Sequence, residues 1–213
     1  MKSGTKFGYF RWLTATVLVI GALAGCATTD PRPPEGKGAA ETRPVSYQRS
    51  GYACCNLRYN ADRITDPSLA QGPFIAIGTP IRVKSINGHH AEVEVGGKPM
   101  RLDLDQGRKV ESVEQWVNQL VVLEDPSPQL QRFSPAVRNA IVRGQVMKGM
   151  TTEQVIMALG YPQLDGKLHL DGPSWRYWWS TMAPYYVYWT KKRTVARVDG
   201  HAEAVANLVY KGK

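Results

Sequence analysis

The sequence has few of the residues that bind metals or act as catalytic nucleophiles and bases. It contains three cysteines and four histidines among 213 residues. Two of the histidines, His89 and His90, directly follow an Asn-Gly pair, a position typical of exposed turn residues. The chain contains no phosphate-binding loop, zinc-ligand spacing or nucleophile elbow. We therefore predict a protein that is not an enzyme and that has no catalytic residue, metal or cofactor.

Long apolar runs are also absent, apart from one stretch near the N-terminus. Residues 13–23 are mostly apolar and follow Lys2, Lys6 and Arg11, with no acidic residue before them. The run is too short for a transmembrane helix, which needs roughly 20 apolar residues. A basic segment, an apolar segment and small residues after them form the pattern of a secretory signal peptide. We assign residues 1–25 to such a signal.

Acidic side chains are scarcer than basic ones. The chain has 27 Lys and Arg residues against 18 Asp and Glu, which gives a formal net charge of +9. Removal of the predicted signal, with its three basic residues and no acidic one, leaves +6. A basic surface suits anionic phospholipid or an acidic protein partner, and export argues against nucleic acid as a ligand. The alternative is a solvated surface without a ligand, because the basic residues are scattered along the chain.

The end of the apolar run resembles the lipobox of bacterial lipoproteins. The four residues are Leu23-Ala24-Gly25-Cys26. The resemblance implies cleavage between Gly25 and Cys26 and attachment of lipid to Cys26, where several acyl chains together give firm membrane anchoring. Ala27 occupies the position at which aspartate retains such proteins in the inner membrane, so the resemblance implies the outer membrane, with the protein on its periplasmic side. The alternative is an ordinary signal peptide followed by a chance cysteine.

The segment after the predicted lipid anchor has the composition of a linker. Residues 26–45 are rich in Pro, Gly, Ala, Thr and charged residues, and they contain no aliphatic cluster. Such a segment buries too little apolar surface to offset its conformational entropy. We therefore predict a disordered tether.

Residues 46–110 have the alternating pattern of a small antiparallel β-protein. Apolar and polar residues alternate over 79–86 and 90–95, and the Asn87-Gly88 pair between them is a strong hairpin signal. A Gly-Gly turn and a third alternating stretch follow. The stretch 78–83 resembles the entry into bacterial Src-homology-3-like barrels. We assign residues 46–110 to a small β-barrel-like domain.

The two remaining cysteines, Cys54 and Cys55, are adjacent. Neighbouring residues of a strand point to opposite faces, and their Cα atoms are about 3.8 Å apart, below the roughly 4.4–6.8 Å that is usual for a disulfide. We expect two unpaired thiols. The alternative is a strained vicinal disulfide in an oxidising compartment.

Three helix starts follow, each marked by a capping residue. Ser112 and Thr151 begin capping boxes, each with a glutamine three residues later, and Ser134 precedes a proline at the first helical position. We assign the first helix to a connecting segment, residues 111–133. The other two helices open the C-terminal domain, residues 134–200.

The C-terminal domain ends in aromatic residues that alternate as in β-strands. We predict three antiparallel strands over 175–179, 185–189 and 193–198. Residues 201–213 are weakly patterned and form a tail, either a loose helix or disordered. The predicted fold class is α+β, with a small antiparallel β-barrel-like N-terminal domain followed by a two-helix, three-stranded antiparallel sheet domain.

Residues 146–162 resemble the signature of the SmpA/OmlA (BamE-like) outer-membrane lipoproteins. That signature has a Gly-Met-Thr loop, a Gln-Val pair in a short helix and a Leu-Gly-x-Pro exit, which here are Gly149-Met150-Thr151, Gln154-Val155 and Leu159-Gly160-Tyr161-Pro162. The resemblance covers roughly residues 134–198 and leaves the β-rich region outside it. It implies a non-catalytic scaffold or accessory factor in outer-membrane protein assembly and envelope integrity, with envelope proteins such as the β-barrel assembly machinery as partners.

The same two-helix, three-strand unit is also similar to β-lactamase-inhibitor repeats, and a shared fold does not decide function. This second likeness leaves an alternative open. The alternative is a periplasmic ligand-binding or inhibitor lipoprotein whose partner is a peptide, peptidoglycan or an enzyme.

The aromatic strands also predict a candidate partner-binding face. If one side of the sheet packs on the helices, strand alternation leaves four residues on the opposite side: Arg176, Trp178, Tyr186 and Tyr188. Aromatic residues beside arginine are typical of protein interfaces. The alternative is that the N-terminal barrel, or the helix after Ser112, covers this side of the sheet.

Overall fold

The computed structural model describes residues 48–64, 69–88, 90–103, 112–163 and 170–212. The predicted signal peptide, the predicted lipid-anchor residue Cys26 and the predicted tether lie outside the described residues. Residues 42–213 form one unit, which contains two hydrophobic cores. Within the described segments, no helix is both long enough and apolar enough to span a bilayer.

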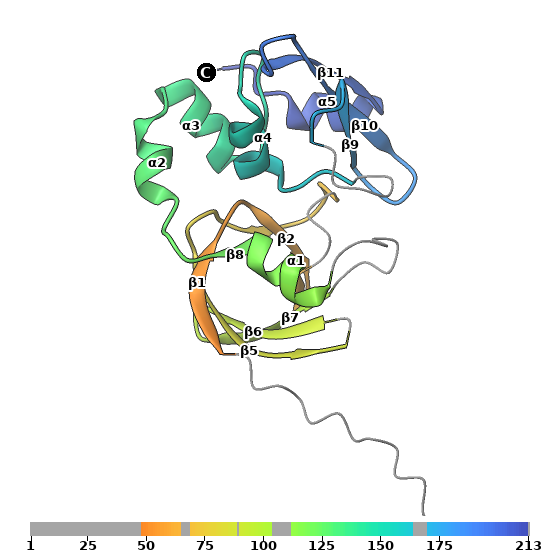
Figure 1. Cartoon of the computed structure of the whole chain (residues 1–213). Coiled ribbons are helices and arrows are strands. Elements are labelled where there is room, and N and C mark those ends of the chain that lie inside the picture. Colours follow the sequence, from red (N-terminus) through yellow and green to blue (C-terminus); the bar gives the residue numbers. More distant parts are fainter. Residues whose placement is uncertain (1–47, 65–68, 89, 104–111, 164–169, 213) are drawn as a thin grey trace, which may run out of the picture. The chain divides into compact units, whose positions relative to one another are not determined.

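A curled eight-stranded sheet surrounds the first core as a half-barrel (Figure 1). Its strands are β1 (Arg49–Ala53), β2 (Leu57–Asn60), β3 (Arg63–Ile64), β4 (Phe74–Ile75), β5 (Pro80–Asn87), β6 (His90–Val95), β7 (Lys98–Asp103) and β8 (Val121–Val122). Their order in the sheet is β4-β2-β3-β7-β6-β5-β1-β8. The α+β class is as predicted.

One strand pair corrects the prediction of an antiparallel sheet. All neighbouring strands in the described sheet are antiparallel except β3 and β7, which are parallel. β3 follows β2 after a tight turn in which Ala61 adopts a φ of 52°, and this reversal points β3 in the same direction as β7. The sheet is therefore mixed. The parallel pair was not predicted because a two-residue strand at a tight turn has too little sequence pattern to indicate its partner.

The predicted hairpin at Asn87-Gly88 is confirmed. β5 and β6 pair from Ile81–Val95 to Asn87–His90, and Gly88 has a φ of 54°, which an L-residue with a side chain adopts less readily. Alternate residues of both strands face the first core and are buried. The register shifts after Val83, where a bulge interrupts the alternation.

The helix predicted for the connecting segment packs into the first core. It is α1 (Val113–Leu120), and it lies beside β8 (Figure 1). Its capping box is present, because the Gln115 N–H donates to Ser112 Oγ and the Ser112 N–H donates to Gln115 Oε1. Trp116 and Leu120 are at most 1% exposed among the strands. This helix therefore forms part of the first core.

The second core is built by four helices and a three-stranded antiparallel sheet in the order β11-β10-β9. These elements are α2 (Ser127–Arg132), α3 (Pro135–Val142), α4 (Thr152–Leu159), β9 (Ser174–Trp178), β10 (Pro184–Trp189), β11 (Val195–Gly200) and α5 (Ala202–Leu208). The predicted caps hold α3 and α4: Ser134 Oγ accepts from the Val137 N–H, and Thr151 forms a full capping box with Gln154. The two predicted helices and three predicted strands are therefore confirmed.

Two helices of this core lie where no firm helix was predicted. α2 forms at Pro126 and Pro128, because proline is tolerated in a first helical turn, where its missing N–H is not needed. α5 forms in the predicted tail, and its Leu208 is buried in the second core. The Val146 N–H donates to the Leu208 carbonyl at 2.8 Å, which connects the tail to the loop between α3 and α4.

The expectation of two unpaired thiols is wrong in this structure. Cys54 and Cys55 form a vicinal disulfide, with their Cα atoms 3.8 Å apart. They lie in the bend between β1 and β2 instead of in a strand, so the alternation of strand side chains does not separate their sulfurs. Cys55 is fully buried in the first core, and Cys54 is half-buried.

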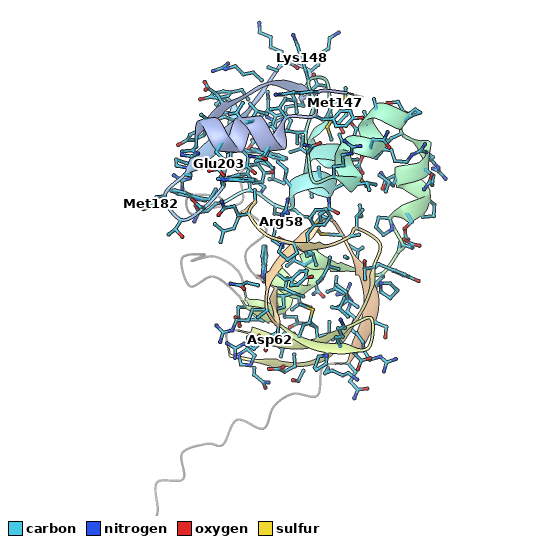
Figure 2. All side chains as sticks on the ribbon, turned by 180° about the vertical axis from the view of Figure 1, so that it is seen from behind. Arg58, Asp62, Met147, Lys148, Met182 and Glu203 are labelled. Atoms are coloured by element: carbon cyan, nitrogen blue, oxygen red, sulfur yellow. A yellow bond between two sulfur atoms is a disulfide. The ribbon has the colours of Figure 1, made fainter. Side chains whose placement is uncertain are left out.

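Two buried polar residues, one just before β2 and one within it, lie beside the second core. Asn56, which is 1% exposed, donates its side-chain amide to the carbonyls of Ile141 and Ala158, near the ends of α3 and α4. Arg58, 9% exposed, lies over the Phe74 ring at 4.6 Å and is labelled in Figure 2. Burial lowers the pKa of the Arg58 guanidinium. Buried polar side chains thus join the two cores.

Candidate partner-binding surfaces

The three-stranded sheet has one buried face and one partly exposed face. On β9 and β10, the side chains at most 1% exposed on the buried face are Trp175, Tyr177, Tyr185 and Val187. Those half-buried on the opposite face are Arg176, Trp178, Tyr186 and Tyr188, which we call the outer face. Strand alternation thus placed these four residues on the face opposite the core, as predicted. A role for the outer face in binding stays a prediction.

Arginine side chains lie over the aromatic rings of the outer face. The Arg197 guanidinium carbon is 3.8 Å from the centroid of the Tyr188 ring, and that of Arg176 is 5.7 Å from the centroid of Trp178. The Tyr186 and Tyr188 ring centroids are 6.3 Å apart. Each cation–π contact contributes roughly 0.5–1 kcal/mol at an exposed site. Rings held in this way lose less conformational entropy when a partner binds.

Arg197 also belongs to the outer face, but the sequence analysis did not predict it there. It lies opposite Tyr188 because β10 and β11 pair Tyr188 with Arg197. That register depends on the turn between the strands, and it shifts beside Trp189. Alternation alone places Arg197 on a face of β11 but does not say which tyrosine it meets.

The edge of β9 beside the outer face is occupied. Leu69 forms a β-bridge with Trp178, and the Ala70 N–H donates to the Trp178 carbonyl at 2.7 Å. The Trp178 indole N–H also donates to Gln163 Oε1. These contacts engage the edge of β9 and the Trp178 indole.

Tyr186 and Tyr188 are the more available side chains of the outer face. Both lie on β10, the central strand of the three. Within the part of the chain that the structure describes, neither hydroxyl donates or accepts a hydrogen bond. Among the described residues, none therefore competes with a partner for these hydroxyl groups.

A groove that the sequence did not predict opens beside α2 and α4. It has a volume of about 740 Å³. Its apolar lining includes Val122, Ile156 and Met157, and three carboxylates line it as well: Glu124, Asp125 and Glu153. We call it the acidic groove. No local sequence pattern indicates this groove, because its walls come from β8, α2, α4 and the Cys54 bend, which are separated along the chain.

The carboxylates of the acidic groove bond to neutral groups. Asp125 Oδ1 accepts from the Ser127 N–H at 2.8 Å, and hydrogen bonds from Ser127 hold the pKa of Asp125 below its usual range. Glu153 Oε1 accepts from the Gln129 side-chain amide at 2.7 Å. Arg132 also lines the groove. Across the described segments, no cation lies within ion-pair distance of these three carboxylates.

Among the described residues, no three His, Cys, Asp or Glu side chains are grouped so that they could hold a metal ion. Gly25 and Cys26, the predicted cleavage and lipid-anchor residues, lie outside the described ranges. Comparison of the chain with protein-family models, with curated proteins and with solved structures finds no match.

Proposed function

We propose that this chain is an outer-membrane lipoprotein, anchored through lipid on Cys26 and facing the periplasm. It acts without catalysis, as a scaffold or accessory factor in outer-membrane protein assembly and envelope integrity. The anchor rests on the likeness of Leu23-Ala24-Gly25-Cys26 to a lipobox. The assembly role rests on the likeness of residues 146–162 to the BamE-like signature.

The outer face is the observation that carries a binding role. Tyr186 and Tyr188 combine a large apolar ring with a hydroxyl that bonds to no described residue, and Arg197 lies over the ring of Tyr188. Tyrosine, tryptophan and arginine are the residues that dominate interface energies, because they bury much area with little loss of side-chain freedom. An envelope protein that contacts this face is the partner we expect, with the β-barrel assembly machinery as the first one to test.

Crosslinking of the full-length lipidated chain in membranes tests the proposal. We expect assembly-machinery components to co-purify with the wild-type chain. The double variant Tyr186→Ala/Tyr188→Ala loses that recovery, whereas Tyr52→Ala, a half-buried tyrosine of β1 away from the outer face, keeps it. Equal recovery with all three proteins would contradict a binding role for the outer face.

The anchor has its own measurement. Metabolic labelling with a palmitate analogue is expected to label the wild-type chain and not Cys26→Ser. Cell fractionation is expected to find the Cys26→Ser variant outside the outer-membrane fraction. A labelled Cys26→Ser protein, or a wild-type protein in the soluble fraction, would contradict lipid anchoring at this residue.

A further inference from the structure

The acidic groove is a local departure from the charge of the whole chain. The chain carries a formal net charge of +9, yet three carboxylates and one arginine line this groove. On the half-barrel, by contrast, two acidic side chains pair with cations: Glu94 with Lys84 at 2.9 Å and Asp103 with Arg101 at 2.7 Å. The groove therefore concentrates negative charge that no cation of the described segments pairs with.

The carboxylates are placed so that they remain accessible. Glu124, Asp125 and Glu153 are all exposed. Glu124 and Asp125 precede α2, and Glu153 lies in the first turn of α4, so the charges come from two different elements that line the same groove. A ligand lying in the groove would therefore meet carboxylates contributed by both elements.

The same groove has an apolar lining. Val122 and Ile156 are half-buried, and Met157 is buried in the second core. Methionine adapts its shape to irregular partners because its side chain is unbranched and flexible. The volume of about 740 Å³ lies within the roughly 300–1,000 Å³ of ordinary ligand sites. A ligand that suits this lining has apolar groups as well as positive charge.

We propose that the acidic groove binds a cationic peptide segment of a partner protein, in which Lys or Arg alternates with aliphatic residues. The basic side chains meet Glu124, Asp125 and Glu153, and the aliphatic ones pack on Val122 and Ile156. β8 forms one edge of the eight-stranded sheet, and its Val122 lines the groove, so an extended segment can lie along it. This site is separate from the outer face and does not depend on the scaffold function.

Fluorescence anisotropy tests the proposal with a labelled eight-residue peptide that alternates Lys and Val. The full-length chain in a neutral detergent is expected to bind this probe, and binding is expected to weaken as salt screens the exposed charges. A matched probe with Glu in place of Lys is expected not to bind. The variant Glu124→Gln/Glu153→Gln is expected to weaken the Lys-Val probe about tenfold, which corresponds to about 1.4 kcal/mol.

The control variant is Glu203→Gln, which removes an exposed acid of α5 (Figure 2). It has the same change of charge per site outside the groove, and the affinity is expected to stay at the wild-type value. Both groove substitutions keep an oxygen acceptor at exposed positions, so thermal unfolding is expected to be unchanged. Equal affinity of the wild-type and groove variants, or equal binding of both probes, would overturn the proposal.

Chemical protection locates the bound peptide. Cys54 lines the acidic groove while Cys55 is fully buried, so after mild reduction iodoacetamide is expected to modify Cys54 first. The Lys-Val probe is expected to slow this modification several-fold, as mass spectrometry of the Cys54 peptide would show. Unchanged modification of Cys54 would mean that the peptide does not bind in the groove. Self-association of the chain that the groove variant abolishes and the probe does not displace would mean that the groove binds a second copy of this chain instead.

Discussion

The side-chain amide of Asn56 donates to the main-chain carbonyl of Ile141 at 2.7 Å. Asn56 lies just before β2 of the half-barrel, and Ile141 lies near the C-terminal end of α3. The last carbonyls of a helix have no partner within that helix. Asn56 supplies one here, and it also donates to the Ala158 carbonyl of α4 at 3.1 Å and accepts from the Ile77 N–H. One buried residue thus satisfies groups of three segments.

Replacing Asn56 with Ala is therefore expected to destabilise the protein strongly. The change leaves the Ala158 carbonyl and the Ile77 N–H without partners, and each unsatisfied buried group costs about 1–3 kcal/mol. It also removes one of the two hydrogen bonds of the Ile141 carbonyl, which still accepts from the Gly144 N–H. We expect a loss of about 3 kcal/mol or more, measured by urea unfolding. Asn207→Ala is the matched control, because its exposed amide bonds only to Glu203 one helical turn away. Similar losses for both variants would contradict a joining role for Asn56.

The junction between the cores also restricts Gly144. This glycine has a φ of +64°, and an added Cβ would lie 2.8 Å from Arg58 Nη2 and 3.3 Å from the Phe74 ring. Arg58 cannot move away freely, because it is buried, bonds to the Gly72 carbonyl and stacks on Phe74. Gly144→Ala is therefore expected to carry a steric cost in addition to the backbone cost of about 1–2 kcal/mol.

Gly149→Ala separates the two costs. Gly149 also has a positive φ, of +90°, but an added Cβ would meet nothing within 4 Å. We expect Gly144→Ala to lose about 1–2 kcal/mol more than Gly149→Ala in urea unfolding, as overpacking usually costs. Equal losses would show that Arg58 yields to the methyl group.

Two stacked tyrosines of the second core are expected to respond oppositely to loss of their hydroxyl groups. Tyr177 and Tyr185 are fully buried, with ring centroids 5.4 Å apart. The Tyr177 hydroxyl donates to the Gly160 carbonyl at 3.1 Å, whereas that of Tyr185 bonds to no described residue. Burial raises the pKa of both phenols, so both stay neutral in the folded protein.

Tyr177→Phe is expected to lose about 1 kcal/mol, because it removes a hydrogen bond and leaves a buried carbonyl unpaired. Tyr185→Phe is expected to be neutral or to gain stability, because it removes a buried polar atom that has no partner. Thermal unfolding of the pair measures the difference. A larger loss for Tyr185→Phe than for Tyr177→Phe would contradict this assignment.

Local signals in the sequence were sufficient for several elements but not for the contacts between them. Ser112 and Thr151 specify capping boxes within four residues, and Asn87-Gly88 specifies a hairpin, so each could be recognised without knowledge of the rest of the chain. Asn56 bonds to residues 85 and 102 positions away. No local pattern encodes such contacts, and the acidic groove, built from separate segments, was missed for the same reason.

The outer face was predicted better than the groove because strand alternation is itself a local rule. It placed Tyr186 and Tyr188 opposite the buried Tyr185 and Val187. It did not reveal that Arg197 lies over Tyr188, because that contact depends on the register between two strands. The vicinal disulfide escaped prediction because the rule for strands was applied to a bend.

Asp125 gives the stability an acid-dependent component. Hydrogen bonds from Ser127 lower its pKa in the folded protein, while in the unfolded chain the pKa stays near its ordinary value of about 3.9. A group with a lowered folded pKa stabilises the protein above the unfolded value, and the contribution is lost as the pH falls through the folded one. Asp125→Ala is therefore expected to be less stable than the wild type at pH 7, and this difference in stability is expected to shrink as the pH falls below about 4.

Urea midpoints of both proteins at pH 7, 5 and 3 measure this difference in stability. Glu124→Ala is the control, since the adjacent Glu124 carboxylate makes no hydrogen bond within the described segments. A gap that stays constant with pH, or one equally large for Glu124→Ala, would mean that Asp125 does not stabilise the start of α2 through its charge.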